Sequence, residues 1–166
     1  MTIQKNFLSP LGYQLTIQKI PNTIINVVSV NIPGITVEDS EVQTPFKVLR
    51  YPDKLVYNDL VVRFKVDEDM SNYIEIYDWM NQIGRPEQFS APNPDAILPN
   101  DLYSNYSSDG TLLILNSVNK ANIEIRFKDL FPVVMSDIEF SSQETDVSYV
   151  DATVTFRMLS FTIHRS

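Results

Sequence analysis

The side chains that could carry out catalysis or bind a metal are few in this chain, and they stand far apart. Its 166 residues include no cysteine and a single histidine, His164. One imidazole without thiolates supplies neither an ordinary zinc site nor a general base supported by a partner. A disulfide framework and a cysteine nucleophile are excluded for the same reason. We therefore expect no catalytic role for His164.

Carboxylates are the other groups that could take part in catalysis or bind a metal. Two close pairs of them occur, Asp137 with Glu139 and Glu144 with Asp146. Strand alternation would put the first pair on one face, where a solvated edge competes with a glycosidase-like acid/base pair. The acidic run 67–69 lacks the later glycine and glutamate of a calcium loop. The four glycines are scattered singly, without a phosphate-binding cluster. The sequence predicts no catalytic, cofactor-binding or metal-binding residues, and no enzyme.

Composition narrows the class of protein further. The net charge is −8, whereas a nucleic-acid-binding surface needs a surplus of lysine and arginine. The apolar fraction of 43% and the charged fraction of 20% are typical of a globular protein. No apolar run approaches the roughly 18 residues of a membrane span. We expect one soluble intracellular domain over residues 1–166, without membrane contact and with nine residues of extended N-terminal arm.

One stretch predicts an amphipathic helix, Asp67–Gly84. Its apolar residues have helical spacing, namely Met70, Tyr73, Ile74, Tyr77, Met80 and Ile83. Asp69 suits the N-cap, Gly84 suits a left-handed position after the last turn, and Pro86 stops the helix. The only tryptophan, Trp79, stands just off this stripe. Since an isolated helix of this length is marginal in water, its apolar face must pack on a sheet.

Strand patterns precede this helix. Tyr13, Leu15 and Ile17 alternate with polar residues, Pro21 and Asn22 suit a turn, and the run 24–32 predicts a second strand. Pro33 and Gly34 close it. Leu60, Val62, Phe64 and Val66 share one face of a strand over 58–66.

A hairpin is expected between these strands. Residues 35–46 suit a polar acidic connection, and 46–50 is expected to pair with 55–57 around the turn Tyr51-Pro52-Asp53-Lys54. Five of the thirteen basic residues fall at positions 47–65: Lys47, Arg50, Lys54, Arg63 and Lys65. Either they form a solvated face, or the hairpin docks on an acidic surface of another copy.

Strands return after an irregular, proline-rich region at 85–110. The run 111–116 is apolar, Asn119 and Lys120 suit a turn, and residues 123–127 alternate. Pro132 confines the run 130–140 to an edge or an irregular start. The last strand changes phase at Met158-Leu159, as a β-bulge or a strand that switches sheets would. The sequence thus predicts a mainly β fold of two packed antiparallel sheets, a sandwich or barrel, with one flanking α-helix.

Several of these stretches, taken in order, resemble the tail tube proteins of contractile-tailed phages. The N-terminal part of the resemblance comprises Ile32-Pro33-Gly34-Ile35, the hairpin, Tyr57–Val66 and the acidic helix start with Tyr77-Asp78-Trp79. The C-terminal part comprises Leu130-Phe131-Pro132, the strand to Phe140 and the long last strand. The resemblance covers about two thirds of the chain.

The resemblance implies a structural subunit whose hexameric rings stack into a tail tube, the conduit for DNA delivery. DNA would pass through the lumen without specific binding, and tail sheath and baseplate proteins would be partners. It also implies a place in the virion, after assembly in the host cytoplasm. The family's hairpin reaches a neighbouring ring, so the basic hairpin 46–57 is the expected inter-ring contact, and Trp79 on the helix is expected to pack within a subunit or at a ring interface. The inter-subunit contact candidates are the following residues: Pro33, Gly34, Lys47, Arg50, Lys54 and Trp79.

Three alternatives remain open on the sequence alone. A tube-initiating baseplate protein and a secretion-system tube homologue share the fold that the resemblance implies. The third is a β-sandwich carbohydrate-binding module that uses the tyrosine-rich loop, with Tyr103 and Tyr106 as its contact residues.

Overall fold

A computed structural model of the chain describes residues 7–84, 106–141 and 149–165. Two helices and nine strands occur in these ranges: β1 (Tyr13–Ile17), α1 (Pro21–Ile25), β2 (Val27–Val30), β3 (Ile35–Gln43), β4 (Val48–Tyr57), β5 (Leu60–Lys65), α2 (Ser71–Gly84), β6 (Ser108–Leu115), β7 (Ala121–Met135), β8 (Asp151–Arg157) and β9 (Ser160–Arg165). The described helices include none that is long and apolar enough to cross a membrane.

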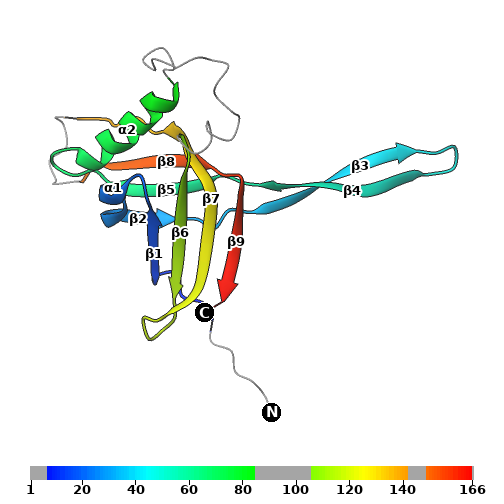
Figure 1. The fold of residues 1–166 in the computed structure, drawn as a ribbon, viewed down its shortest axis with the longest axis horizontal. Coiled ribbons are helices and arrows are strands. Elements are labelled where there is room, and N and C mark those ends of the chain that lie inside the picture. The colour runs from blue at the N-terminus through cyan, green and yellow to red at the C-terminus, as the bar shows by residue number, and fades with distance from the viewer. Residues whose placement is uncertain (1–6, 85–105, 142–148, 166) are drawn as a thin grey trace, which may run out of the picture.

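The strands form one large antiparallel sheet and one separate hairpin. Seven strands make the large sheet, in the order β1-β6-β7-β8-β5-β2, with β9 paired to β7. β3 and β4 pair only with each other, and they extend away from the body of the molecule (Figure 1). The predicted mainly β, antiparallel fold is confirmed, although a second, short helix, α1, accompanies the flanking helix.

The long strand β7 divides the large sheet into two parts. Its first part pairs with β6 and β9, while residues 131–135 pair with β8. An irregularity between Pro132 and Val134 accompanies the change of partner, which fits a residue without a backbone N–H. In Figure 1 the β1, β6, β7 and β9 strands run across the direction of β5 and β8. The two parts therefore enclose one core between them.

The end of the chain follows the phase change expected at Met158-Leu159. β8 pairs with β5 and with the second part of β7, whereas β9 pairs with the first part of β7. The strand thus switches from one part of the sheet to the other at this step. Phe161, in the new phase, is buried against Phe127 with ring centroids 6.0 Å apart. The predicted switch is confirmed.

Alternating strands supply most of the core, as their patterns predict. Leu60, Val62 and Phe64 of β5 are fully or almost fully buried, and Val154 and Phe156 of β8 lie opposite them in register. β1 contributes Leu15 and Ile17, β6 contributes Leu112 and Ile114, and β7 contributes Ile125, Phe127 and Leu130. Residues from all these strands belong to one cluster.

The helix α2 exists where it is expected, but its buried face differs from the predicted stripe. Ile76 is 0% exposed and Trp79 is 3% exposed, whereas Ile74 is 48% exposed and Tyr77 47%. Tyr73, Met80 and Ile83 are partly buried beside the core. The buried face of α2 is therefore rotated about the helix axis, by part of a turn, from the stripe that the sequence predicts. Asn72 is also buried on this face, and a pattern of apolar residues does not predict the burial of a polar side chain.

Asn72 links α2 to the end of β5. Its side-chain amide donates to Lys65 O at 2.7 Å, and its Oδ1 accepts from Asp67 N at 3.2 Å. Thr23 of α1 donates its hydroxyl proton to Asn72 O at 3.0 Å. These bonds satisfy buried polar groups where the chain turns into the helix.

The helix also begins and ends differently from the sequence expectation. It starts at Ser71, and residues 67–70 form a turn in which Met70 N donates to Asp67 O at 2.9 Å. Asp69 is therefore not the N-cap. Gly84 is the last helical residue and does not have a positive φ, so the left-handed position predicted for it is wrong. Pro86 lies outside the described residues.

Other boundaries need correction. Pro21 and Asn22 begin the short helix α1 rather than a turn, because proline fits the first helical position. The strand expected over 24–32 shortens to β2. The irregular region expected at 85–110 falls largely outside the described residues, and its last three residues belong to β6. The N-terminal arm is described only from residue 7.

Candidate assembly surface

The hairpin leaves the body at the Pro33-Gly34 step. Pro33 is buried, and Gly34 O accepts a hydrogen bond from Asn58 N at 2.9 Å. A Cβ on Gly34 would lie 2.9 Å from the side-chain nitrogen of Asn58, which is closer than van der Waals contact permits. Two of the six candidate contact residues therefore lie at the base of the hairpin, where Pro33 is buried and Gly34 is exposed.

The hairpin itself is longer than the sequence predicts. β3 includes most of the stretch that was expected to be a polar connection, and β4 runs through Tyr51-Pro52-Asp53-Lys54, so the predicted turn there is wrong. The connection between the strands lies instead at residues 44–47, where Thr44 N donates to Lys47 O at 3.0 Å. Every residue of β3 is exposed, so the burial pattern that reveals an ordinary strand is missing.

The proline and its neighbours form a β-bulge in β4 rather than a turn. Val37 pairs with Leu55 and Asp39 with Pro52, so that Asp53 and Lys54 together lie opposite one residue, Glu38. Pro52 cannot donate a ladder hydrogen bond, and bulges are one place where a strand accepts such a residue.

The cations of the hairpin differ in how they are used. Arg50 lies 2.5 Å from Glu41 and 3.4 Å from Asp39, and Lys54 lies 3.0 Å from Glu38. The hydrogen bond and the charge of Glu38 raise the pKa of Lys54 above its usual value. The ion pairs of the described residues do not include Lys47, which stands at the tip. Lys47 is therefore the hairpin cation that can meet another molecule without breaking a pair.

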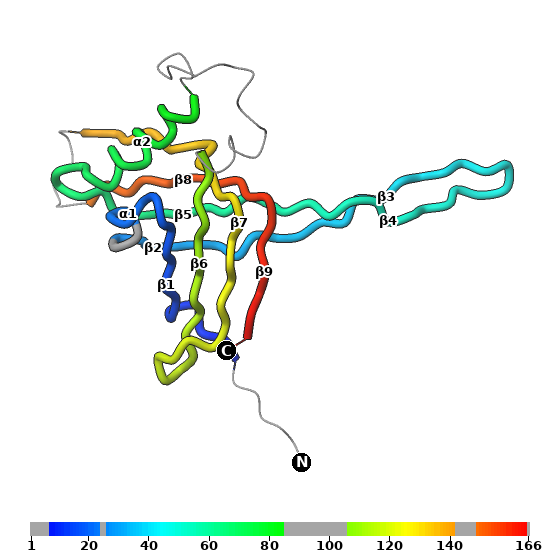
Figure 2. Tube along the Cα trace, in the orientation of Figure 1, coloured from blue at the N-terminus to red at the C-terminus, as the bar shows by residue number. Residues whose placement is uncertain are grey.

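Apolar side chains of the hairpin are left uncovered by the body. The exposed set is Ile35, Val37, Val42, Phe46, Val48, Tyr51 and Leu55. Phe46, at the tip, is 97% exposed. A two-stranded hairpin is marginal by itself in water, so a long one with bare apolar residues is typical of a segment that is covered on assembly. Figure 2 follows the hairpin trace well beyond the other strands.

The sheet also has free edges. β1 and β2 end the strand order, but they approach each other, since Tyr13 Oη donates to Val28 O at 2.6 Å. β9 pairs with β7 on one side, and the described strands leave its other side unpaired. Leu159 and Ile163 are exposed near that edge. An unpaired edge of this kind can accept a strand of a neighbouring chain.

Trp79, the sixth candidate contact residue, lies inside the subunit. Its indole N–H donates to Tyr106 O at 2.7 Å, and its ring centroid lies 5.9 Å from that of Phe156. Lys19 Nζ lies 5.5 Å from the centre of the same ring. Little of this side chain remains for a sugar or for another subunit. Tyr103 lies outside the described residues.

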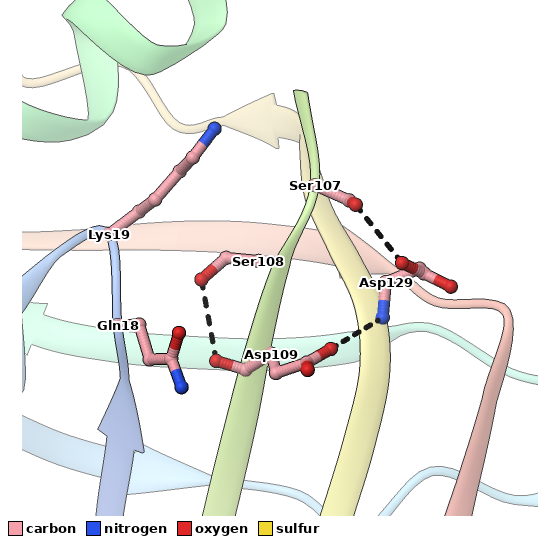
Figure 3. A pocket seen from close by; sticks show the side chains of 6 residues that line it. All are labelled: Gln18, Lys19, Ser107, Ser108, Asp109 and Asp129. Atoms are coloured by element: carbon pink, nitrogen blue, oxygen red, sulfur yellow. Dashed lines mark hydrogen bonds between the residues drawn. The ribbon is translucent and has the colours of Figure 1, made fainter. Parts of the chain in front are cut away.

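A polar pocket of about 370 Å³ lies between the end of β1 and the start of β6. Figure 3 shows its lining residues: Gln18, Lys19, Ser107, Ser108, Asp109 and Asp129. Ser107 Oγ donates to Asp129 Oδ1 at 3.1 Å, and Asp129 N donates to Asp109 Oδ1 at 3.2 Å. Burial lowers the pKa of Lys19.

This pocket lacks a catalytic arrangement. Both of its carboxylates accept hydrogen bonds from the pocket itself, and it contains neither histidine nor a pair of carboxylates that face one another across open space. No cluster of three potential metal ligands occurs among the described residues. His164 lies elsewhere, on β9, with its Nε2 3.1 Å from Thr162 Oγ1. Of the close carboxylate pairs, Asp137 and Glu139 are exposed, and the other pair lies outside the described residues.

The sequence correctly placed Lys47, Arg50 and Lys54 in a hairpin. It did not indicate that the same hairpin exposes apolar side chains. The alternation of Ile35 and Val37 was available as a signal. It was hidden because acidic residues follow directly, and because Leu55 pairs with Val37 only through the bulged register.

The sequence of this chain is similar to those of known proteins. A family model described as phage tail tube protein matches residues 10–164. The tail tube terminator protein of Enterobacteria phage T4 is 28% identical over 145 residues, which cover 85% of this chain and 78% of that protein.

Solved structures share the fold. The tube-terminating cap of the anti-feeding prophage superposes with a TM-score of 0.68 at 12% identity, over 100% of this chain and 95% of that chain. A chain of the sheath-tube complex of an extracellular contractile injection system, PVC, in its extended state has a TM-score of 0.65 at 12% identity. The match covers 96% of this chain and 92% of that one.

Proposed function

This chain belongs to the phage tail tube protein family, and we propose that it forms a hexameric ring that terminates the tube of a contractile tail. The observation that carries the proposal is the β3–β4 hairpin, which stands away from the core with apolar residues on a surface that the subunit leaves bare. A segment of this kind is stable when a neighbouring subunit covers it.

The free edge of β9 supports closure into a ring. In a heterologous contact, each subunit offers one surface to the next subunit and accepts a different one from the subunit before it. Repetition of such a contact generates a ring when the rotation closes and an open filament when it does not. Pairing of β9 with a neighbour's sheet would satisfy its unpaired backbone groups and cover Leu159 and Ile163. The proposal therefore has two inter-subunit contacts. The β9 edge makes the contact within the ring, and the hairpin residues Lys47, Arg50 and Lys54 make the contact with the next ring or the tube end.

The charge of the chain supports a conduit for DNA. With a net charge of −8 per subunit, a ring of six carries a strong negative potential. Phosphates passing through it would be repelled, so DNA would not bind during delivery. We propose that the ring contacts the tail sheath outside, within the virion, after assembly in the host cytoplasm.

Two positions along the tail are compatible with the family. The sequence likeness to the phage T4 tail tube terminator favours the end of the tube. The alternative is a main tube subunit whose rings stack repeatedly, which the reach of the hairpin favours. A baseplate or secretion-system tube protein would share the same ring.

Electron microscopy and sedimentation of the purified full chain, over rising concentration, distinguish the two positions. The terminator proposal expects six-fold rings that do not grow into long tubes. Extended tubes of many rings would overturn the terminal position and support the main tube subunit. A protein that stays monomeric at high concentration would overturn both.

Charge reversal at the hairpin tip tests the contact itself. Lys47→Glu should prevent the ring from binding to the next ring or to a tube end, with the monomer fold unchanged by circular dichroism. Lys120→Glu, in the exposed turn between β6 and β7, is the control with the same change in net charge. Equal loss in both variants would attribute the effect to net charge, and normal binding by Lys47→Glu would reject the hairpin contact.

A further inference from the structure

A pocket of about 220 Å³ opens where the two ends of the large sheet meet, between the start of β1 and the end of β2. We propose that residues 1–5 of the same chain fold back over this pocket in the free subunit, as a strap that closes these sheet ends to a neighbouring copy. The inhibitory part of this inference rests on the proposed function, because the contact that the strap delays is the contact within the ring.

The pocket has an apolar lining that the described residues leave partly uncovered. Leu112 and Ile114 of β6 are buried residues of this lining. Two others are exposed to water, Leu8 by 61% and Ile32 by 47%. Transfer of exposed apolar surface out of water is favourable, so an apolar side chain that enters this pocket stabilises the subunit.

The segment that can supply such a side chain begins beside the pocket. Leu8 lines the pocket, and residues 1–6, which lie outside the described residues, precede it closely in the chain. A two-residue turn at Lys5-Asn6 brings Ile3 opposite Leu8, and asparagine tolerates the left-handed conformation that such a turn requires. Because directly opposite residues of an antiparallel pair share a face, Ile3 then faces the pocket together with Leu8.

The N-terminal segment repeats part of the sequence of β1 and its continuation. Residues 2–5 and residues 16–19 both read Thr-Ile-Gln-Lys. In the second occurrence Ile17 is 1% exposed, whereas the residues on either side of it are exposed. The matching residue of the first occurrence is Ile3. The same alternation therefore suits an extended segment with Ile3 on its buried face and Gln4 on its solvated face.

The pocket lies at the sheet ends that a neighbour would use. The strand order of the large sheet ends at β1 and β2, and Tyr13 Oη donates to Val28 O at 2.6 Å between them. Tyr13 and Val30 both line the pocket. In the proposed ring the β9 edge of one subunit needs an acceptor edge on the next, and β1 and β2 supply the other edges of the described sheet. A strap over the pocket competes with that neighbour.

This competition lowers the fraction of subunits that can assemble. A strap that is closed about ten times as often as it is open leaves roughly one subunit in eleven able to accept a neighbour, and the apparent affinity falls by about that factor. Free subunits then form rings only at a higher concentration. A tube end can offset the cost of opening the strap, because it adds contacts that a free subunit lacks.

Thiol protection in the monomer tests whether the strap is closed. The chain has no cysteine, so Ile3→Cys and Gln4→Cys each create one thiol, on the buried and the solvated face of the segment respectively. At a concentration where the chain is monomeric, the thiol of Ile3→Cys should react with a maleimide about tenfold more slowly than that of Gln4→Cys, because it reacts only when the strap opens. Equal rates would overturn the strap. Protection that disappears on further dilution would also overturn it, since the pocket would then hold a segment of a second copy.

A matched pair of charge changes tests the inhibitory role. Ile3→Asp and Gln4→Asp change the net charge equally, but only the first puts a carboxylate into the apolar pocket and so opens the strap. Sedimentation should show ring formation by Ile3→Asp at about a tenfold lower concentration than by Gln4→Asp. Ring formation by Ile3→Asp at the same or a higher concentration would overturn the inhibitory role. Absence of rings in every chain would overturn the proposed function and that role with it, while the thiol rates of the monomer still decide whether the strap exists.

Discussion

Replacement of two isoleucines on the same helix gives the sharpest test of how α2 packs. Ile76→Ala and Ile74→Ala remove the same atoms at positions two residues apart. Ile76 is 0% exposed within the core cluster, whereas Ile74 is 48% exposed. The apolar stripe read from the sequence includes Ile74 and omits Ile76, so the sequence pattern and the tertiary structure predict opposite rankings of the two variants.

The expected magnitudes follow from burial. Truncation of a buried isoleucine to alanine costs about 2–5 kcal/mol, from lost transfer free energy and the cavity that remains. We expect about 3 kcal/mol for Ile76→Ala. About half of Ile74 is already in water, and alanine favours the helix by roughly 0.4 kcal/mol relative to isoleucine. Ile74→Ala should therefore change the free energy of unfolding by less than about 1 kcal/mol.

Urea denaturation at a concentration where the chain is monomeric measures both values. Trp79 is the only tryptophan and is buried three residues from Ile76, so its fluorescence reports the packing of this helix. Circular dichroism of the same samples follows the backbone, and coincident transitions license the comparison. A loss of about 3 kcal/mol corresponds to a fall in Tm of roughly 6–12 °C for a chain of this length.

One result would refute the packing of α2 described above. If Ile74→Ala lowers the free energy of unfolding as much as Ile76→Ala, or more, then the helix buries the stripe that the sequence alone predicts. The contacts of Trp79 with Phe156 and Tyr106 would then also be wrong, because one rotation of the helix moves all of these side chains together.

Three further perturbations test separate parts of the fold. Gly110→Ala places a Cβ 2.7 Å from Cδ1 of Leu130, a fully buried residue of β7, and should lower the free energy of unfolding by about 1–3 kcal/mol. Gly84→Ala places its Cβ in open space and should be neutral or stabilising. Equal effects of the two variants in thermal denaturation would contradict this packing. Asn72→Ala leaves two partly buried backbone groups, Lys65 O and Asp67 N, without their side-chain partner and should cost about 2 kcal/mol in urea. A neutral result would contradict the link between β5 and α2. The hydrogen bond and charge of Arg126 lower the pKa of Glu124, so this pair contributes stability at neutral pH that is lost as pH falls through the folded-state pKa. Arg126→Gln should raise the pKa of Glu124 measured by NMR, and an unchanged value would exclude the ion pair.

The strands of the core were predictable from the sequence because each one has a buried face and a solvated face. Leu60, Val62 and Phe64 alternate with the exposed residues Val61, Arg63 and Lys65, and Ala152, Val154 and Phe156 alternate with polar residues. Burial imposes a period of two on such segments, and that period remains visible in the residues. The phase change at Met158-Leu159 was readable for the same reason, since the strand buries a different set of residues after it changes partner.

The candidate assembly surface was less predictable, because the hairpin has no core beneath it. A strand that is exposed along its whole length shows no contrast between a buried and a solvated face, so β3 reads as an acidic connection. The proline signal at 51–54 was assigned to a turn because proline suits both turns and bulges, and only the pairing of Asp39 with Pro52 distinguishes them.

The sequence by itself determined the class of this protein: a mainly β chain without a catalytic constellation, an acidic charge, a single long helix and a resemblance to tail tube proteins. These properties follow from residue types and their periodicity, which are local. The tertiary structure decided which face α2 buries and where the hairpin turns. Those features depend on pairing and packing between residues far apart in the chain. A one-residue difference in register reverses a face without leaving any mark in composition.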